Sequence, residues 1–463
     1  MRALTAALTG IFVLGSTVSG CFEAGANFNQ QAPGNNDSGG VDLGGTEKWN
    51  PDPANPDTTS SMFYGAVAVA PSGDYFLSRA GTDLIHGDLT TGGTRLVGVA
   101  GPRKIAFASK ASRFYVTTDA GSVHAVEPAS LKVIWNRSTA LGPDVKIYAS
   151  KDDKHLVAAG VDTIKILDAA TGQLTGQLSA GLIQDVDISP DSAAAIVTLQ
   201  HSWPAGAEAP ETRILLVDLK KTGYSEITVP NCSSPLVLTP DGTKAFLAPT
   251  HCINPNSSYD PVSVIDLVAK KWVRNLPGFG PVAMATDGVT AVAFMDAQNL
   301  DMTLFDDPAQ APSAANGRYH MMLLDTSTLK FHSVPLGDDL PRYTMTPDGQ
   351  VVLVDLGGFW QEAGIRLLDV KTRKIHGVSG PVVKLDHFVV SPNSSDVYLL
   401  YYADLYWLSI PQRTVKHVPA APLGWQAMNI TPGGEQLLLL DSQGTLHLYD
   451  IPTETIVHSM TPP

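Results

Sequence analysis

The chain has 463 residues, a formal net charge of −14 and an apolar content of 44%. This acidic balance argues against nucleic acid and anionic membrane surfaces as partners, because both attract clustered Lys and Arg. The apolar content is that of an ordinary globular core, and no run after the N-terminal segment is long enough for a transmembrane helix.

Residues 1–20 have the organisation of a secretion signal, in which Arg2 precedes the apolar run 3–14 and a stretch of small residues. The following Val18-Ser19-Gly20-Cys21 resembles the bacterial lipobox. The resemblance implies diacylglycerol on Cys21 and cleavage before it. With Phe22 next, it also implies anchoring in an outer membrane, although the side that the protein faces stays open. The alternative is an ordinary signal peptide followed by a chance cysteine.

Residues 21–60 are rich in Gly, Asn, Asp and Pro and poor in aliphatic side chains. This composition predicts a disordered tether behind the lipidated cysteine. A flexible chain of about 39 residues has a root-mean-square span of roughly 35 Å. The remainder, 61–463, is predicted to be one domain.

The stretch 144–178 reads as one unit of four short strands. Strands at Val145–Ala149 and His155–Ala159 flank a polar turn, and a third strand ends at Asp168. A Thr-Gly turn then leads into a fourth strand near Leu174–Leu178.

Two features of this unit recur in step nine times, at spacings from 39 to 60 residues. The first is a Ser/Thr-Pro-Asp/Asn-Gly-like turn between the first two strands, clearest at Ser189, Thr239, Thr346, Ser391 and Thr431. The second is an acid that closes the third strand, at Asp88, Glu127, Asp168, Asp218, Asp266, Asp325, Asp369 and Asp450, with Ser409 in the eighth unit. We expect the acid to accept backbone N–H bonds from the next turn. Four strands in each unit at this period indicate an all-β propeller.

The segment Ile166–Leu174 (ILDAATGQL) and the Ser/Thr-Pro-Asp-Gly turns are similar to the YVTN/WD40-like, quinoprotein-type propeller repeat. The resemblance implies the fold and little else, because such repeats serve many unrelated functions. Nine units exceed the usual four to eight blades, so nine blades and eight blades both stay open. The first unit opens with an inner-type strand and the last ends with an outer-type strand. We therefore expect the ring to close without a shared blade.

Cys232 and Cys252 flank the hairpin that turns at 240–243. Antiparallel pairing about this turn makes partner numbers sum to about 483 or 484, which places the two cysteines opposite each other. Because an exported protein lies where disulfides persist, we expect a disulfide here that secures a loop. The alternative is two separate thiols.

Charged residues, with one His and one Trp, begin the strands that should line the central channel. They lie four or six residues before the turn mark, at Arg103, Asp144, Lys146, Asp185, Arg342, His387 and Trp425. Regular alternation would put both positions on one side of the strand, around one mouth of the channel. One interpretation is a pocket for an anionic or mixed-charge ligand. The other is a solvated lining with internal ion pairs.

The loops after the second strand are long in units four to seven, over 201–212, 251–260, 296–318 and 357–364. Long loops on one face of a rigid ring favour recognition, with His201, Trp203, His251 and Trp360 as candidates. Tolerated insertion is the alternative. Two histidines are too few for a predicted metal site. The longest loop contains several acids (Asp296, Asn299, Asp301, Asp306 and Asp307), but their spacing differs from that of a calcium loop.

No catalytic or cofactor motif stands out, and neither a Gly-x-Ser-x-Gly elbow nor a Cys-x-x-Cys-His haem site is present. The prediction is therefore an exported, lipid-anchored propeller that binds an envelope or surface protein and contacts the membrane only through its lipid, with no cofactor. The alternative is an enzyme of the lactonase or dehydrogenase-like propeller type. Its site would lie in the channel mouth, with Asp144, Asp185 and His387 as acids or metal ligands.

Overall fold

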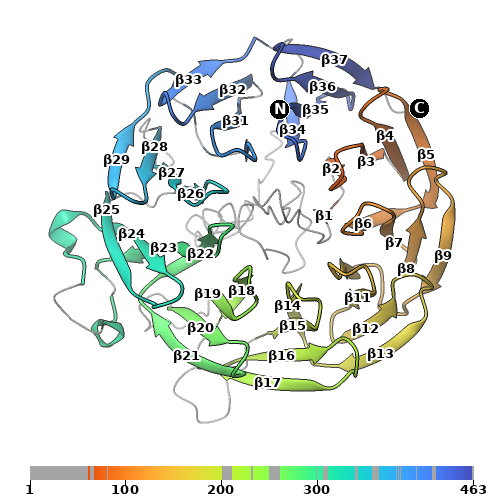
Figure 1. Cartoon of the computed structure of the whole chain (residues 1–463), viewed down its shortest axis with the longest axis horizontal. Coiled ribbons are helices and arrows are strands. Elements are labelled where there is room, and N and C mark those ends of the chain that lie inside the picture. The colour runs from red at the N-terminus through yellow and green to blue at the C-terminus, as the bar shows by residue number, and fades with distance from the viewer. Residues whose placement is uncertain are drawn as a thin grey trace, which may run out of the picture.

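The computed structural model of the chain is almost entirely antiparallel β-structure, arranged as a closed ring of blades around a central axis (Figure 1). The structure describes residues 61–62, 67–80, 82–200, 211–230, 233–249, 261–298, 300–305, 311–338, 342–356, 364–381, 383, 385, 387–402, 404–419 and 424–460. The predicted signal and tether, 1–60, lie outside these residues. No helix in the described part of the chain is long and apolar enough to cross a membrane.

Nine sheets form the blades, and in each one the four strands follow chain order from the channel outward. Blades 1 to 3 contain β2 (Val67–Val69), β3 (Tyr75–Ala80), β4 (Asp83–Asp88) and β5 (Thr94–Ala100); β6 (Pro102–Phe107), β7 (Phe114–Thr118), β8 (Ser122–Val126) and β9 (Val133–Ser138); and β10 (Lys146–Ala149), β11 (His155–Ala159), β12 (Thr163–Asp168) and β13 (Leu174–Ser179).

Blades 4 to 6 contain β14 (Ile183–Ile188), β15 (Ala194–Leu199), β16 (Thr212–Asp218) and β17 (Tyr224–Val229); β18 (Ser233–Leu238), β19 (Lys244–Pro249), β20 (Val262–Asp266) and β21 (Lys271–Leu276); and β22 (Phe279–Met284), β23 (Thr290–Asp296), β24 (Tyr319–Asp325) and β25 (Phe331–Gly337). Two short 3₁₀ helices, η2 (Met302–Leu304) and η4 (Ala314–Asn316), lie between β23 and β24.

Blades 7 to 9 contain β26 (Arg342–Met345), β27 (Val351–Asp355), β28 (Ile365–Asp369) and β29 (Lys374–Gly377); β30 (His387–Val390), β31 (Asp396–Tyr401), β32 (Asp404–Ser409) and β33 (Thr414–His417); and β34 (Trp425–Ile430), β35 (Gln436–Asp441), β36 (Leu446–Asp450) and β37 (Thr455–Met460). The predicted all-β propeller is confirmed, and the count is nine blades.

The position of a strand in its blade determines its hydrophobic pattern. Second strands such as β11 (HLVAA) are buried along almost their whole length, because neighbouring blades cover both faces of the sheet. Fourth strands such as β5 (TRLVGVA) alternate between buried and exposed residues, since one of their faces meets water.

The acid that closes the third strand caps the following turn, as predicted. In blade 3, Asp168 Oδ1 accepts the N–H groups of Ala170 (3.1 Å) and Thr171 (2.8 Å) and the Thr171 hydroxyl (2.7 Å). Equivalent backbone N–H bonds are made by Asp88, Asp218, Asp266, Asp325, Asp369 and Asp450. Each bond joins residues two or three apart, so the turn is encoded locally.

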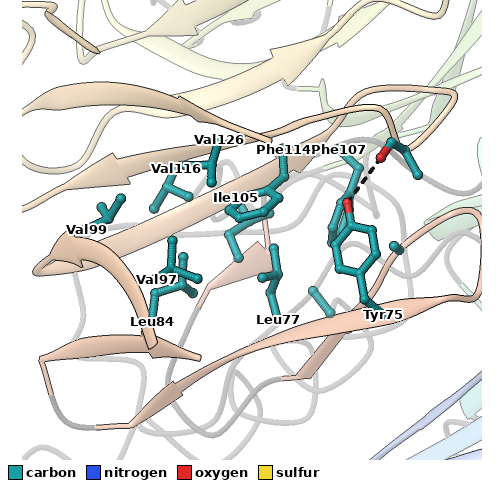
Figure 2. Close-up of a cluster of buried hydrophobic side chains, with 13 residues drawn as sticks. Tyr75, Leu77, Leu84, Val97, Val99, Ile105, Phe107, Phe114, Val116 and Val126 are labelled. Atoms are coloured by element: carbon teal, nitrogen blue, oxygen red, sulfur yellow. Dashed lines mark hydrogen bonds between the residues drawn. The ribbon is translucent and has the colours of Figure 1, made fainter. Parts of the chain in front are cut away.

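The hydrophobic core is divided into nine clusters in the described residues, and each cluster joins one blade to the next. Figure 2 shows the first cluster, in which Leu77 and Val97 of blade 1 pack against Ile105, Phe114 and Val116 of blade 2. The core therefore consists of the joints between blades, since the channel separates opposite sides of the ring.

The ring closes between blade 9 and blade 1 by the same kind of contact. Leu438 and Leu448 of blade 9 share a cluster with Phe76 of blade 1, and Asn429 Nδ2 donates to the carbonyl of Val67 (3.0 Å). No described blade combines strands from the two ends of the chain, which confirms the predicted closure. The short strand β1 (Ser61–Met62) pairs with β6 on its channel side, so blade 2 has a fifth strand (Figure 1).

Candidate functional site

The two faces of the ring have different contents. We call the face where first strands begin and second strands end the loop face, and the opposite face, with the Ser/Thr-Pro-Asp-Gly turns, the turn face. The predicted channel-mouth residues are distributed over six blades on the loop face. Arg103 is in blade 2, Asp144 and Lys146 in blade 3, Asp185 in blade 4, Arg342 in blade 7, His387 in blade 8 and Trp425 in blade 9.

Five of the nine first strands contain a register shift near their start, in β6, β14, β18, β22 and β34. Such a bulge inserts a residue and reverses the inward–outward alternation beyond it. In β34 the shift lies between Trp425 and Ala427. Trp425 is consequently buried, at 5% exposure, and packs with Val389 and Leu439 between blades 8 and 9. The prediction that Trp425 faces the channel mouth assumes a strand without a bulge, and the bulge makes that prediction wrong.

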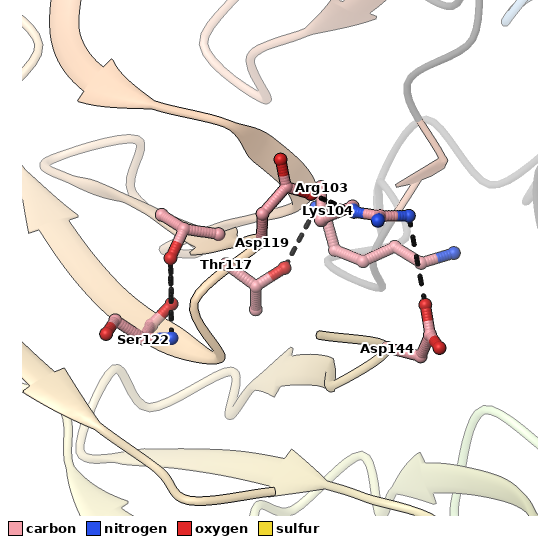
Figure 3. A network of polar contacts seen from close by, with 7 residues as sticks. Arg103, Lys104, Thr117, Asp119, Ser122 and Asp144 are labelled. Carbon is pink, nitrogen blue, oxygen red and sulfur yellow. Dashed lines mark hydrogen bonds and ion pairs between the residues drawn. The ribbon is translucent and has the colours of Figure 1, made fainter. Parts of the chain in front are cut away.

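Arg103 forms the most visible polar network of the channel mouth (Figure 3). Its Nε donates to Asp119 Oδ1 in its own blade, and its Nη1 lies 3.9 Å from Asp144 Oδ1 at the start of blade 3. The side chains of Asp119 and Asp144 are 52% and 78% exposed. Ion pairs this exposed contribute about 0–1 kcal/mol, because water and salt screen them. The network joins two blades and leaves polar groups accessible.

Four aspartates in the described residues are buried, and all lie on the loop face. They are Asp185, Asp296, Asp355 and Asp441, with exposures of 2%, 2%, 2% and 3%. The last three end the second strands of blades 6, 7 and 9. Sequence analysis did not single out Asp355 or Asp441, although an Asp after an apolar second strand was a usable signal.

Two of these carboxylates hold the neighbouring blade. Asp355 Oδ2 accepts the N–H of Leu385, which precedes blade 8 (3.1 Å), and Asp185 Oδ2 faces the N–H of Leu236 in blade 5 (3.5 Å). Arg342 lies directly opposite Asp355 in the β26–β27 register. A buried carboxylate is costly unless it accepts hydrogen bonds. Here the carboxylates accept them from the neighbouring blade, so they help to join two blades.

In blade 9, three side chains are hydrogen-bonded in series. His447 Nε2 contacts Asp441 Oδ2 (3.0 Å), and His447 Nδ1 contacts the hydroxyl of Ser459 (2.9 Å). Burial raises the pKa of Asp441, but hydrogen bonds from His447 and from the N–H groups of Thr445 and Gln443 outweigh it, so the pKa is lowered overall. The order Asp–His–Ser is that of a nucleophilic site.

Blade 6 contains a similar His–Ser pair without the acid. His320 Nδ1 contacts the hydroxyl of Ser333 (2.8 Å), and its Nε2 contacts the carbonyl of Gly317 (3.1 Å). In both blades the histidine is on the third strand and the serine on the fourth. The recurrence indicates that the pair connects these two strands, and we therefore assign the blade 9 series to structure.

The long loop of blade 6 is closed at its base by an ion pair between a buried aspartate and a half-buried arginine. Arg318 donates through Nε (3.0 Å) and Nη2 (2.8 Å) to Asp296 Oδ2, whose side chain is 1% exposed. Further out, Leu304 O accepts from Arg274 Nη2 of blade 5 (2.9 Å), and Phe305 packs edge-on against Phe331 (5.6 Å). These contacts connect the described part of the loop to blades 5 and 6.

The acids of this loop are engaged with the protein where they are described. Asp301 Oδ1 caps η2 by accepting the N–H of Thr303 (2.9 Å), and Asp296 binds Arg318. Asn299, Asp306 and Asp307 lie outside the described residues. Within the described part of the chain, no three His, Cys, Asp or Glu side chains are grouped as metal ligands.

The remaining predicted residues of the loop face lie outside the described part of the chain, namely His201, Trp203, Cys232, His251, Cys252 and Trp360. The cysteine prediction assumes that paired residues in this hairpin have numbers that sum to 483 or 484. A register shift in β18 changes that sum next to Cys232, because Ser233 is paired with Pro249 and their numbers sum to 482. The disulfide stays a prediction.

No protein-family model and no curated protein matches the chain. Among solved structures it is similar to "Dihydro-heme d1 dehydrogenase NirN in complex with DHE" (16% identity, 89% of this chain, 74% of that chain, TM-score 0.47). It is also similar to "Structure of Dos1 propeller" (13% identity, 75% of this chain, 91% of that chain, TM-score 0.48). A third similar structure is "Kuenenia stuttgartiensis Hydrazine Synthase" (16% identity, 66% of this chain, 94% of that chain, TM-score 0.37). At such identities the likeness concerns the fold alone.

Proposed function

We propose that the chain is a lipid-anchored cell-envelope β-propeller that binds a protein partner through its loop face. The observation that carries this proposal is the set of contacts made by the described parts of the blade 6 connection. Its base is closed by Asp296 and Arg318, and Leu304 is bonded to Arg274 of blade 5. Met302, two residues before Leu304, is 47% exposed. A segment that is already held by such contacts loses less conformational entropy on binding, which favours recognition.

The neighbouring blades extend the same face. The chain between second and third strands is long in blades 4, 5 and 7, where Leu199 precedes Thr212, Pro249 precedes Val262 and Asp355 precedes Ile365. In blade 3 the corresponding strands end at Ala159 and begin at Thr163. Four consecutive blades thus present long connections on one face, which is the arrangement of a recognition surface on a rigid scaffold.

The alternative enzyme would need acids that converge. Of its named residues, Asp144 and Asp185 belong to blades 3 and 4, whereas His387 is exposed at the start of β30 in blade 8, on the opposite side of the ring (Figure 1). Asp185 faces a backbone N–H of the next blade. This distribution supports binding over a single catalytic centre in the mouth.

The anchor is proposed to be the lipid on Cys21, with the segment 21–60 as its tether. A Cys21→Ser chain should fail to incorporate labelled fatty acid and should leave the membrane fraction in a high-salt wash, which screens any electrostatic contact with lipid headgroups. Persistence of both label and membrane association in that variant would contradict the anchor.

The binding proposal is tested by affinity capture from detergent-solubilised envelopes. One bait is the intact chain, and the other replaces 298–317 with a short Gly-Ser turn, which retains Asp296 and Arg318. We expect one partner to be captured stoichiometrically by the intact bait and lost with the shortened loop. A Val289→Ser chain, altered at an exposed residue of the turn face, is the matched control. Equal capture by all three baits would contradict the proposal.

A further inference from the structure

The outer strands of blades 4 and 5, β17 and β21, lie against each other at the rim of the ring. Lys270, which precedes β21, donates through Nζ to the hydroxyl of Ser225 in β17 (3.0 Å). This contact brings together the turns before the two strands. We call the exposed residues of these two turns and strand starts the rim patch and define it by Lys220, Lys221, Tyr224, Val268, Lys270, Lys271, Trp272 and Val273. Tyr224 is paired with Val217 and so lies on the side of β17 toward blade 3.

The rim patch combines exposed apolar and cationic side chains. Its four lysines are all exposed. Val268 is 73% exposed, Tyr224 54%, Val273 38% and Trp272 37%. Burying such apolar surface would be favourable if a suitable partner covered it.

The acids nearby are committed to the protein. Asp218 Oδ1 accepts the N–H groups of Lys220 (2.8 Å) and Lys221 (2.9 Å), and Asp266 Oδ1 accepts that of Ala269 (2.7 Å). Glu226 is paired with Arg213 (2.6 Å). Asp191 lies near enough to Lys220 for the lysine charge to help lower the pKa of the Asp191 carboxyl, and it adds a third negative charge. Four lysine charges against Asp191, Asp218 and Asp266 leave the patch positive by one, although the whole chain carries −14. Because the Debye length is about 8 Å at physiological ionic strength, charges elsewhere on the ring are largely screened from this surface.

Lysines on a sheet edge also prevent unwanted pairing with other edges. That role accounts for the cations but leaves the exposed Val268, Tyr224 and Trp272 unexplained. Lys combined with Trp, Tyr and aliphatic residues is the composition of surfaces that lie at a lipid–water interface, where rings occupy the headgroup region and ammonium groups meet lipid phosphates.

We infer that the rim patch is a second membrane contact that binds anionic lipid headgroups. The lysines supply attraction, and Val268, Trp272 and Tyr224 enter the headgroup region. The inference draws on the proposed lipid anchor, because a tether of roughly 35 Å span keeps the ring within reach of the bilayer. It revises the expectation that the membrane is contacted only through the lipid.

The test is sedimentation with phosphatidylcholine vesicles that either contain or lack about one-third phosphatidylglycerol, using the full chain with Cys21→Ser. Each lysine near an anionic surface contributes about fivefold in affinity. Changing Lys220, Lys221, Lys270 and Lys271 together to Gln should therefore weaken binding to the anionic vesicles by at least about tenfold. The control changes four scattered exposed lysines to Gln, namely Lys110, Lys132, Lys330 and Lys371, and should lose little. Both variants have the same net charge and the same N-terminal segment.

A second variant tests the apolar part. Val268→Ser with Trp272→Ser should weaken binding at low and high salt alike, since that contribution is not electrostatic. Equal binding by the two lysine variants, or equal binding to both kinds of vesicle, would overturn the inference. Loss of a captured protein together with unchanged vesicle binding in the patch variant would make the patch a protein interface and overturn it too. The loop-shortened chain should still bind vesicles, so failure of the proposed protein-binding function is distinguishable.

Discussion

The acids that close the third strands on the turn face and two buried aspartates of the loop face make different kinds of hydrogen bond. On the turn face, aspartates such as Asp168 bond to groups two or three residues away, and the same turn recurs around the ring. On the loop face, Asp185 and Asp355 reach the next blade, at Leu236 and Leu385. The turn face therefore repeats one local turn, to which bonds such as that from the N–H of Ser109 to Asp153 Oδ1 (2.6 Å) add joints between blades. The loop face differs from blade to blade.

This difference separates folding from recognition. A repeated turn defines each blade by the same rule, and it tolerates water because its carboxylates are exposed or half-buried. The buried carboxylates and long loops occur only in particular blades, where they form an asymmetric surface. A ring with one uniform face and one variable face can change its partner while it retains its fold.

Acidification should have the largest effect, because it acts on many groups at once. Hydrogen bonds from the turn lower the pKa of Asp88, Asp168, Asp218, Asp325, Asp369 and Asp450. Carboxylates with a lowered folded-state pKa stabilise the fold above the unfolded value of about 3.9. That stability is lost as the pH falls through the folded-state pKa.

Histidines whose pKa is lowered by burial add a loss of stability that begins at a higher pH than the loss due to the aspartates. Burial lowers the pKa of His86, His124 and His320. Below about pH 6.5 the unfolded chain therefore takes up protons that the folded chain resists, and stability falls with decreasing pH. Urea unfolding followed by circular dichroism should show one decline below about pH 6.5 and another below about pH 4. A His124→Gln chain should lose part of the first decline only, and an unchanged midpoint between these values would contradict the assignment.

Asp441→Ala tests a buried carboxylate of the loop face, one whose bonds stay within blade 9. It removes the acceptor of the N–H groups of Gln443 and Thr445 and of His447 Nε2 in a site that is 3% exposed. We expect a loss of about 3 kcal/mol in the free energy of unfolding, because the buried His447 Nε2 and two part-buried N–H groups lose their acceptor. Asp441→Asn is the control and should lose less, since it retains one acceptor oxygen. A loss no larger than that of a turn-face aspartate would remove the distinction between the two faces.

Asp168→Ala tests the turn face and should have the smallest effect. It removes two backbone N–H bonds and one hydroxyl bond, but water can replace them at this exposed turn. The expected loss is about 1 kcal/mol, similar to that of a helix cap, measured by the same urea titration. Asp168→Asn should be nearly neutral. A loss above that of Asp441→Ala would reverse the comparison.

The repeat, the strand order and the turn chemistry were readable from the sequence. The turn mark at Ser189 and the acid at Asp168 act through neighbours two to five residues away, so their roles are written in adjacent letters. The predicted strand at His155–Ala159 has the same bounds in the structure. Nine units likewise became nine blades, because each unit buries its strands only against its neighbours.

The tertiary structure decided what depends on contacts between blades. A bulge in β34 turned Trp425 into the core, and no alternation count includes such an inserted residue. The joint at Asp355 depends on a backbone N–H 30 residues further along the chain. The rim patch joins turns at Lys220 and Lys270 into one positive surface on an acidic chain. Net charge sums over the whole sequence, whereas a partner meets only the side chains that folding places together.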